Sequence, residues 1–193
     1  MKNHIITVGG ATRDTTFFTD EGVLIDNQRD VLRQKLLAFK YGAKIKIDRF
    51  YFLFGGGAAN AAVNFAVSGF KTACLARVGQ DESGRAIIAN LRQHGVITSL
   101  VSSEKNRETM ISFILVTPGG ERIIFTSRAA NNDLRISRQE ERILKQADWL
   151  YLASLPGDWL SAARKIFSLS GPKIAWNPGA SQYQAGLKKI ASF

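Results

Sequence analysis

Apolar residues along this chain occur in short continuous runs and at helical spacing, which predicts alternating strands and helices. Short apolar runs predict strands at 5–8, 50–54, 71–77, 149–153 and 173–176. Helical spacing of apolar positions predicts helices over 58–68 and 137–147, and two more that Asp81 and Asp158 would cap. Because the connections are short, the pattern favours an α/β fold with a doubly wound sheet.

A second kind of strand, half-exposed and alternating, is predicted between these runs. Alternation of apolar and polar residues at 15–19, 23–25 and 44–48 predicts short strands. Segments 110–116 and 122–126 flank a turn at Pro118–Gly120, which predicts a hairpin or paired strands.

Gly55, Gly56 and Gly57 join a predicted strand to a helix that carries Asn60 in its first turn. Glycine lets the backbone approach a ligand closely, and a helix start offers N–H groups without partners. The Asn60 carboxamide both donates and accepts hydrogen bonds. These features indicate a site for a hydroxyl-rich or anionic small molecule, and a tight turn without a ligand is the equally weighted alternative. A dinucleotide site is disfavoured because Asn60 stands at the third Gly/Ala position.

Five short segments carry distinctive residue patterns. They are Val8–Asp14, Gly55–Ala62, Val78–Gly84, Pro118–Arg122 and Arg128–Asn132. Their order resembles that of the PfkB (ribokinase-like) carbohydrate kinases, in which the second segment reads Gly-Gly-x-x-x-Asn-x-Ala and the third Val-Gly-x-Asp-x-x-Gly. The resemblance covers nearly the whole chain. It implies a ribokinase-type doubly wound sheet with a small β-lid, whose strands fall within 15–54 and 109–127.

The same resemblance implies that residues 1–193 form a single domain that is incomplete at its C-terminus. In the family, an Asn-x-x-Glu motif organises magnesium and phosphates. A later Asp-Thr-x-Gly-Ala-Gly-Asp motif supplies the anion hole and the catalytic base. Neither motif occurs in this sequence. We therefore expect the N-terminal, sugar-binding portion of a kinase, inactive by itself, with no catalytic residue, ATP site or metal site. ATP and Mg2+ are the cofactors expected of a full-length member.

The residues that hold the acceptor sugar in the family correspond here to Asp14, Gly55, Gly56, Gly57 and Asn60. A carboxylate accepts hydrogen bonds from two adjacent hydroxyls, and glycine N–H groups donate to others. For Asp14 taken alone, a turn or helix cap is the simpler interpretation. Its place after the first strand favours the sugar-binding one.

Ser154 stands where ribokinases have a glutamate near the sugar, so the resemblance carries over the class of substrate and not its identity. The predicted function is an ATP-dependent carbohydrate kinase whose sugar-binding half is this chain. The alternatives are a nucleoside kinase of the same fold and a non-catalytic, regulatory paralogue that binds a sugar or nucleoside.

The formal net charge of +10 is distributed unevenly. Residues 28–49 hold seven Lys or Arg residues, Arg33 among them, against two Asp, which gives this segment a net charge of +5. In decreasing order of weight, we interpret the segment as a solvated lid, as an attractor of an anionic substrate, or as a nucleic-acid binder. The last is disfavoured because the sequence contains no recognised nucleic-acid module.

Other features bear on compartment and partners. The single cysteine, Cys74, excludes a disulfide framework and suits a reducing cytoplasm. Without a signal peptide or an apolar run of about 20 residues, we expect a cytoplasmic chain with no membrane contact. His4 and His94 are too isolated for a metal site. We also expect a small-molecule sugar or nucleoside as ligand, and a homodimer formed through the lid.

Overall fold

The computed structural model describes residues 4–30 and 34–193, so Arg33 lies outside the described residues. The chain divides into two compact units, which we call unit 1 and unit 2. Unit 1 contains Met1–Arg13, Phe54–Ile111 and Thr126–Phe193, and unit 2 contains Asp14–Leu53 and Ser112–Phe125. Among the helices that the structure describes, none combines the length and the apolar run that crossing a bilayer requires.

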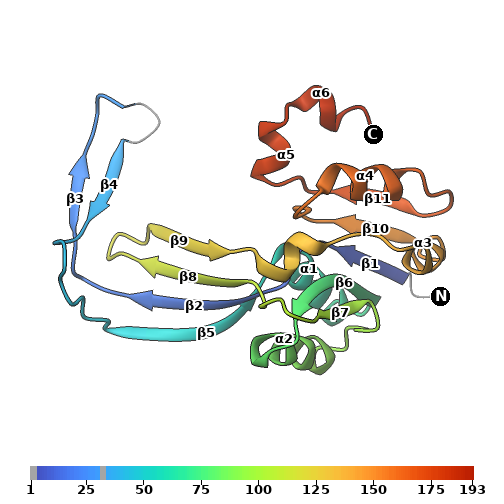
Figure 1. The fold of residues 1–193 in the computed structure, drawn as a ribbon, viewed down its shortest axis with the longest axis horizontal. Coiled ribbons are helices and arrows are strands. Elements are labelled where there is room, and N and C mark those ends of the chain that lie inside the picture. Colours follow the sequence, from blue (N-terminus) through green and yellow to red (C-terminus); the bar gives the residue numbers. More distant parts are fainter. Residues whose placement is uncertain (1–3, 31–33) are drawn as a thin grey trace. The chain divides into compact units, whose positions relative to one another are not determined.

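Unit 1 is built on a five-stranded parallel sheet (Figure 1). Its strands, in spatial order, are β11 (Lys173–Trp176), β10 (Trp149–Leu152), β1 (His4–Val8), β6 (Lys71–Gly79) and β7 (Val101–Glu104). The central strand β1 pairs Ile6 with Leu150 of β10 on one side and with Ala73 of β6 on the other. The chain builds outward from β1 to β6 and β7, then returns to β10 and β11. This reversal places a topological switch point beside β1, and ligands of such sheets bind at the carboxyl ends of the strands there.

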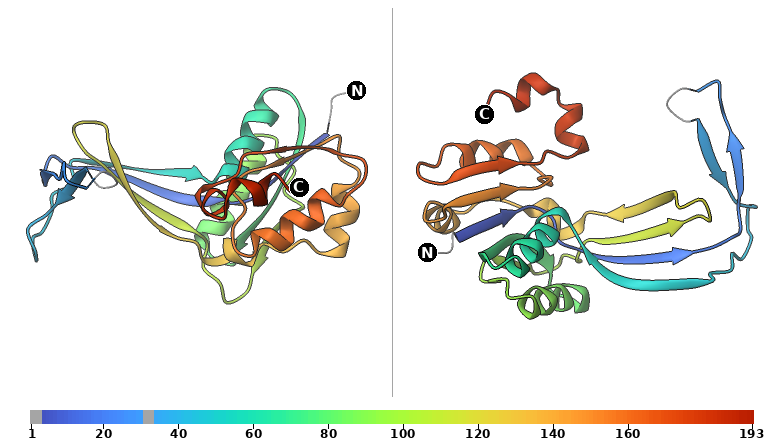
Figure 2. Two further views of the ribbon diagram at one scale, coloured as in Figure 1. Left: turned by 90° about the horizontal axis from the view of Figure 1, so that it is seen from above. Right: turned by 180° about the vertical axis from the view of Figure 1, so that it is seen from behind.

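Helices cover both faces of this sheet, because successive residues of a strand point to opposite sides. On one face, α1 (Gly57–Val67) and α2 (Glu82–Gln93) pack in a cluster with Cys74 and Ala76 of β6. On the other, α3 (Arg138–Leu144) and α4 (Trp159–Phe167) share a core with Leu75. Figure 2 shows the sheet between α1, in teal, and α4, in orange. The prediction of a doubly wound α/β sheet is confirmed.

Side-chain caps confirm the predicted helix starts. Asp81 accepts a hydrogen bond from the Gly84 N–H (2.7 Å) at the start of α2, and Asp158 accepts one from the Ser161 N–H (3.2 Å) at the start of α4. Ser137 opens α3 with a capping box. The other helical segments are short: the 3-10 helix η1 (Ala129–Asp133), α5 (Ala180–Gln184) and α6 (Leu187–Ile190).

The described residues of unit 2 form strands and loops but no helix. A four-stranded sheet, which extends by a few residues into the ranges of unit 1, has the order β5 (Arg49–Gly55), β2 (Thr12–Phe18), β8 (Ile111–Val116) and β9 (Arg122–Ser127). Strands β3 (Val23–Asp26) and β4 (Lys35–Ala38) form an antiparallel two-stranded hairpin.

The strand expected over 44–48 does not form, so this prediction was wrong. The Lys46 N–H donates to the Glu21 carboxylate (3.2 Å), and the Lys46 carbonyl accepts from the Thr19 hydroxyl (2.7 Å). These side chains satisfy backbone groups that a neighbouring strand would otherwise pair. Instead, β3 pairs with β4, whose sequence does not alternate.

Candidate functional site

The glycine segment lies at the start of α1, against the turn that follows β1. Gly56 has a φ of +94°, and a Cβ there would collide with the Gly10 carbonyl oxygen. A Cβ on Gly57 would lie 2.8 Å from the Cβ of Ala153, immediately after β10. Side chains are excluded at both positions because backbone or a short methyl already fills the space. The structure therefore brings together the glycine segment and the carboxyl ends of β1 and β10.

Part of the N–H capacity expected at this helix start is already used within the protein. The N–H groups of Ala58 and Ala59 both donate to the Gly10 carbonyl, at 3.2 and 3.3 Å. The expectation that the helix start offers N–H groups without partners was wrong for these two residues, because the turn after β1 occupies them. The Asn60 N–H donates to the Gly56 carbonyl (2.9 Å), while the Asn60 residue as a whole is exposed.

Asp14 lies on β2, in unit 2, and one of its carboxylate oxygens has an uncommon environment. This oxygen, Oδ1, is buried and accepts no hydrogen bond from any described residue. Nε2 of His4 and Nε1 of Trp176 share this property. Most buried polar atoms in folded proteins have a hydrogen-bond partner. The Asp14 carboxylate is therefore a candidate acceptor for donors of a ligand.

Ser154 follows β10 and is held by Gln182, a residue that sequence reasoning missed. The Ser154 hydroxyl donates to Oε1 of Gln182 (3.4 Å), and the Gly179 N–H donates to the same oxygen (2.8 Å). Nε2 of the fully buried Gln182 donates to the Leu155 carbonyl (2.8 Å). Gln182 stands three residues after Gly179, so its side chain can reach the Gly179 N–H, but glycine has no side chain to complete the capping box that a sequence search would recognise. Gln182 thus ties the start of α5 to the segment that carries Ser154.

The Val78–Gly84 segment forms a clamp through Asp81. Besides capping α2, the Asp81 carboxylate accepts from the Thr109 N–H (2.7 Å) and the Thr109 hydroxyl (2.6 Å). Burial alone would raise the pKa of the Asp81 carboxyl, but hydrogen bonds from Thr109 and Gly84 outweigh this effect and lower the pKa. The Thr109 hydroxyl also accepts from the Gly79 N–H (2.9 Å). This clamp fixes the chain two residues before β8 begins, and we assign it a structural role.

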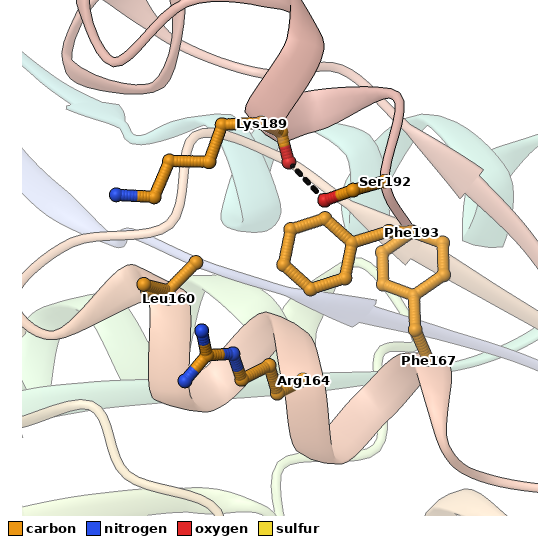
Figure 3. Close-up of a pocket in the computed structure, with 6 residues that line it drawn as sticks. All are labelled: Leu160, Arg164, Phe167, Lys189, Ser192 and Phe193. Atoms are coloured by element: carbon orange, nitrogen blue, oxygen red, sulfur yellow. Dashed lines mark hydrogen bonds between the residues drawn. The ribbon is translucent and has the colours of Figure 1, made fainter.

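A pocket of about 330 Å³ lies elsewhere in unit 1, on α4 (Figure 3). Its lining combines apolar side chains with two cations and comes from α4 and the C-terminal segment: Leu160, Arg164, Phe167, Lys189, Ser192 and Phe193. Within this lining, the Ser192 hydroxyl donates to the Lys189 carbonyl (2.9 Å). None of the site residues expected from the sequence lines this pocket.

The described residues do not form a centre for metal or thiol chemistry. No group of three or more His, Cys, Asp or Glu residues is arranged there to hold a metal ion. Cys74 is fully buried in β6, and burial raises the pKa of its thiol to about 11. Cys74 is a core residue, as expected from the sequence.

Comparison with known proteins identifies the family. Residues 23–191 match the pfkB family carbohydrate kinases. The chain belongs to this family. A ribokinase of Mus musculus is 33% identical over 149 residues, which cover 72% of this chain and 44% of the mouse protein. A ribokinase of Haemophilus influenzae is 28% identical over 146 residues, covering 74% and 48%, and a fructokinase of Vibrio alginolyticus is 32% identical over 101 residues, covering 52% and 33%.

Solved ribokinase structures share the fold of this pfkB-family chain. A ribokinase of Arabidopsis thaliana, complexed with ribose and ATP, superposes with a TM-score of 0.75 at 22% identity, covering 93% of this chain and 54% of that one. A ribokinase of Giardia lamblia gives a TM-score of 0.78 at 20% identity, covering 99% and 59%. This chain spans about half the length, or less, of the curated relatives it matches. The resemblance to the PfkB kinases and the ribokinase-type α/β fold are confirmed.

Proposed function

We propose that this chain provides the acceptor-binding part of an ATP-dependent carbohydrate kinase. Its family membership supports the class of reaction, and the Asp14 carboxylate is the single observation that carries the site. Oδ1 of Asp14 is buried and has no hydrogen-bond donor among the described residues. Leaving a buried acceptor without a partner costs about 1–3 kcal/mol. The hydroxyl groups of a sugar are donors of the right kind to remove that cost.

The other proposed binding residues complement this carboxylate. The exposed Asn60 carboxamide both donates and accepts, so it suits a hydroxyl group in either role. Gly56 and Gly57 let the start of α1 lie against the Gly10 carbonyl and the Ala153 methyl, and with Gly55 they form the segment that we propose lines the acceptor site. The exposed Ser154 offers a neutral hydroxyl group after β10. A site of this composition rejects analogues that lack a hydroxyl, because its own polar groups would remain unpaired.

The chain's own contribution to the reaction is positioning. Phosphoryl transfer depends on holding the acceptor in line and on stabilising the charge of the transferred group. Asp14 and Asn60 would orient the acceptor, whereas ATP would supply the phosphoryl group when bound.

Isothermal titration calorimetry of the 193-residue chain with ribose, fructose and adenosine tests the proposal. We expect saturable binding of at least one sugar, and affinity at least about tenfold weaker for Asp14→Asn, because a hydrogen bond to a charged acceptor is lost. Asp20→Asn is the matched control, since Asp20 is an exposed aspartate of the same unit. Equal affinities of the wild type and Asp14→Asn would refute the site. Binding of adenosine alone would favour a nucleoside acceptor, and no binding of any probe would refute the function.

A further inference from the structure

Asn131 of η1 makes an unusually complete contact with a residue far away in the sequence. Its Nδ2 donates to the Ala11 carbonyl (2.9 Å), and its Oδ1 accepts from the Ala11 N–H (3.4 Å). Nδ2 also lies 2.8 Å from the sulfur of Met110. The Asn131 side chain is almost fully buried, at 1% exposure. One carboxamide thus satisfies both backbone groups of Ala11 from 120 positions along the chain.

Ala11 lies directly beside the glycine segment of the proposed acceptor site. The preceding residue, Gly10, provides the carbonyl that accepts the N–H groups of Ala58 and Ala59 in the first turn of α1. A Cβ on Gly56 would collide with this same carbonyl and lie 2.6 Å from Cα of Ala11. Asp14 follows three residues after Ala11 in the sequence. Displacement of Ala11 would therefore move the support of the glycine segment and the start of the strand that carries Asp14.

The segment around Asn131 is itself held firmly. Ala129, two residues earlier, has a φ of +36°, a conformation that alanine rarely adopts. The Ala130 N–H donates to the Glu108 carbonyl (2.9 Å), which helps to hold this conformation. Strained backbone persists where the surrounding structure over-determines it, commonly next to functional sites. Met110, which contacts Asn131, accepts from the Arg13 N–H (3.0 Å) through its carbonyl and so holds the same strand again.

We infer that Asn131 is a positioning residue for acceptor binding: its carboxamide fixes the Gly10–Ala11 turn, and this turn holds the glycine segment and the strand leading to Asp14. The inference rests on the proposed function and names a residue that acts through others. Asn131 contacts backbone and Met110, so its contribution to ligand affinity is indirect. The effect of Asn131 on the turn can be measured at three N–H groups. The Ala11 N–H donates to Asn131, and the N–H groups of Ala58 and Ala59 donate to the Gly10 carbonyl of the same turn.

Amide hydrogen exchange and sugar titration of the same samples test this role. The variant is Asn131→Asp, which keeps the shape but replaces the donor to the Ala11 carbonyl with an acceptor. We expect exchange at Ala11, Ala58 and Ala59 to become about tenfold faster or more, and sugar affinity to fall about tenfold, with exchange at Leu75 unchanged. Asn132→Asp, at the exposed neighbouring asparagine, is the matched control and should leave both readouts unchanged. Asn131→Ser replaces the first variant if thermal unfolding shows that Asn131→Asp does not fold.

The outcomes separate this inference from the function on which it rests. Unchanged exchange at the three alanines overturns the inference even where the sugar binds. Faster exchange with unchanged sugar affinity also overturns it, because the hydrogen bonds between Asn131 and Ala11 would then stabilise the fold without affecting sugar binding. Faster exchange in a chain whose wild type binds no sugar refutes the proposed function, and the positioning role falls with it.

Discussion

Units 1 and 2 use apolar residues in opposite ways. In unit 1 they are buried between a sheet and the helices on its two faces, and of the buried hydrophobic residues in the described chain Leu115 alone belongs to unit 2. Large exposed hydrophobic residues are concentrated in unit 2 instead: Val23, Leu24, Ile25, Leu36, Phe39, Tyr41, Ile47, Phe50, Tyr51, Phe52, Leu53, Phe113, Ile123, Ile124 and Phe125. Unit 1 has its own core, whereas unit 2 exposes apolar sheet surface.

This difference shows which unit depends on something outside itself. Large hydrophobic residues that are exposed in one unit favour a surface for a partner or a ligand. A two-stranded hairpin such as β3–β4 is also marginal in water unless something packs on it. We therefore expect unit 1 to determine the stability of the chain and unit 2 to determine what the chain associates with.

The largest expected effect comes from the same substitution made in each unit. Leu75→Ala in β6 removes a fully buried side chain and should lower the free energy of unfolding by about 2–5 kcal/mol. Leu53→Ala in β5, where the side chain is 49% exposed, should cost about 1 kcal/mol or less. Urea unfolding followed by tryptophan fluorescence measures both. Similar losses for the two variants would contradict the contrast between the units.

The next effect concerns the place where the chain leaves unit 1 for β8. Asp81→Ala removes three hydrogen bonds to one carboxylate and should lower the free energy of unfolding by about 2–3 kcal/mol. Asp158→Ala, at a helix cap with one hydrogen bond, is the matched control and should cost about 1 kcal/mol. Equal costs would show that Thr109 adds nothing to the cap.

The Asp81 clamp also predicts a dependence on pH. Its folded-state pKa lies below the usual value of 3.8, so the folded state favours the charged carboxylate. The contribution is fully present above the unfolded-state pKa and is lost as pH falls through the lowered folded-state pKa. The difference in urea midpoint between wild type and Asp81→Ala should therefore stay constant from pH 7 to about 5 and shrink by pH 3. A difference that persists undiminished at pH 2 would contradict this assignment.

A smaller effect tests what unit 2 associates with. If its exposed sheet pairs with a second copy of the chain, Phe50→Asp should weaken self-association at least about tenfold, because a charge replaces a 58% exposed aromatic side chain. Val67→Asp in unit 1, at 65% exposure, is the control and should leave self-association unchanged. Sedimentation equilibrium measures both variants. A wild-type chain that stays monomeric over the accessible concentrations would refute the expected homodimer.

Local signals in the sequence predicted much of unit 1. Caps at Asp81 and Asp158 and the strand at 173–176 were found because each depends on neighbouring residues. The long-range contacts of Thr109, Gln182 and Asn131 could not be predicted, since they join residues 21 to 120 positions apart. Such contacts are created by the fold, and the spacing of residue types does not reveal them.

Unit 2 was predicted less well because its strands are not determined by burial. Alternation at 44–48 indicated a strand, yet the Thr19 hydroxyl, which donates to the Lys46 carbonyl, and the Glu21 carboxylate, which accepts from the Lys46 N–H, hold that backbone in an irregular conformation. Where both faces of a strand are exposed, alternation specifies pairing only weakly. The role of 15–54 and 109–127 as a lid, and residues 1–193 as a single domain, stay predictions.

The smallest effect tests how firmly unit 1 holds strained backbone. Alanine at the φ of Ala129 is strained, so Ala129→Gly should raise the free energy of unfolding by up to about 1 kcal/mol. Ala130→Gly, one residue later, is the matched control and should lower it by about 1 kcal/mol, because Ala130 is fully buried and has no positive φ. Thermal unfolding of the two variants measures opposite signs for the same substitution. Equal decreases in the free energy of unfolding of the two variants would mean that Ala129 is not strained. The backbone strain at Ala129 would then no longer support the view that the segment around Asn131 is firmly held.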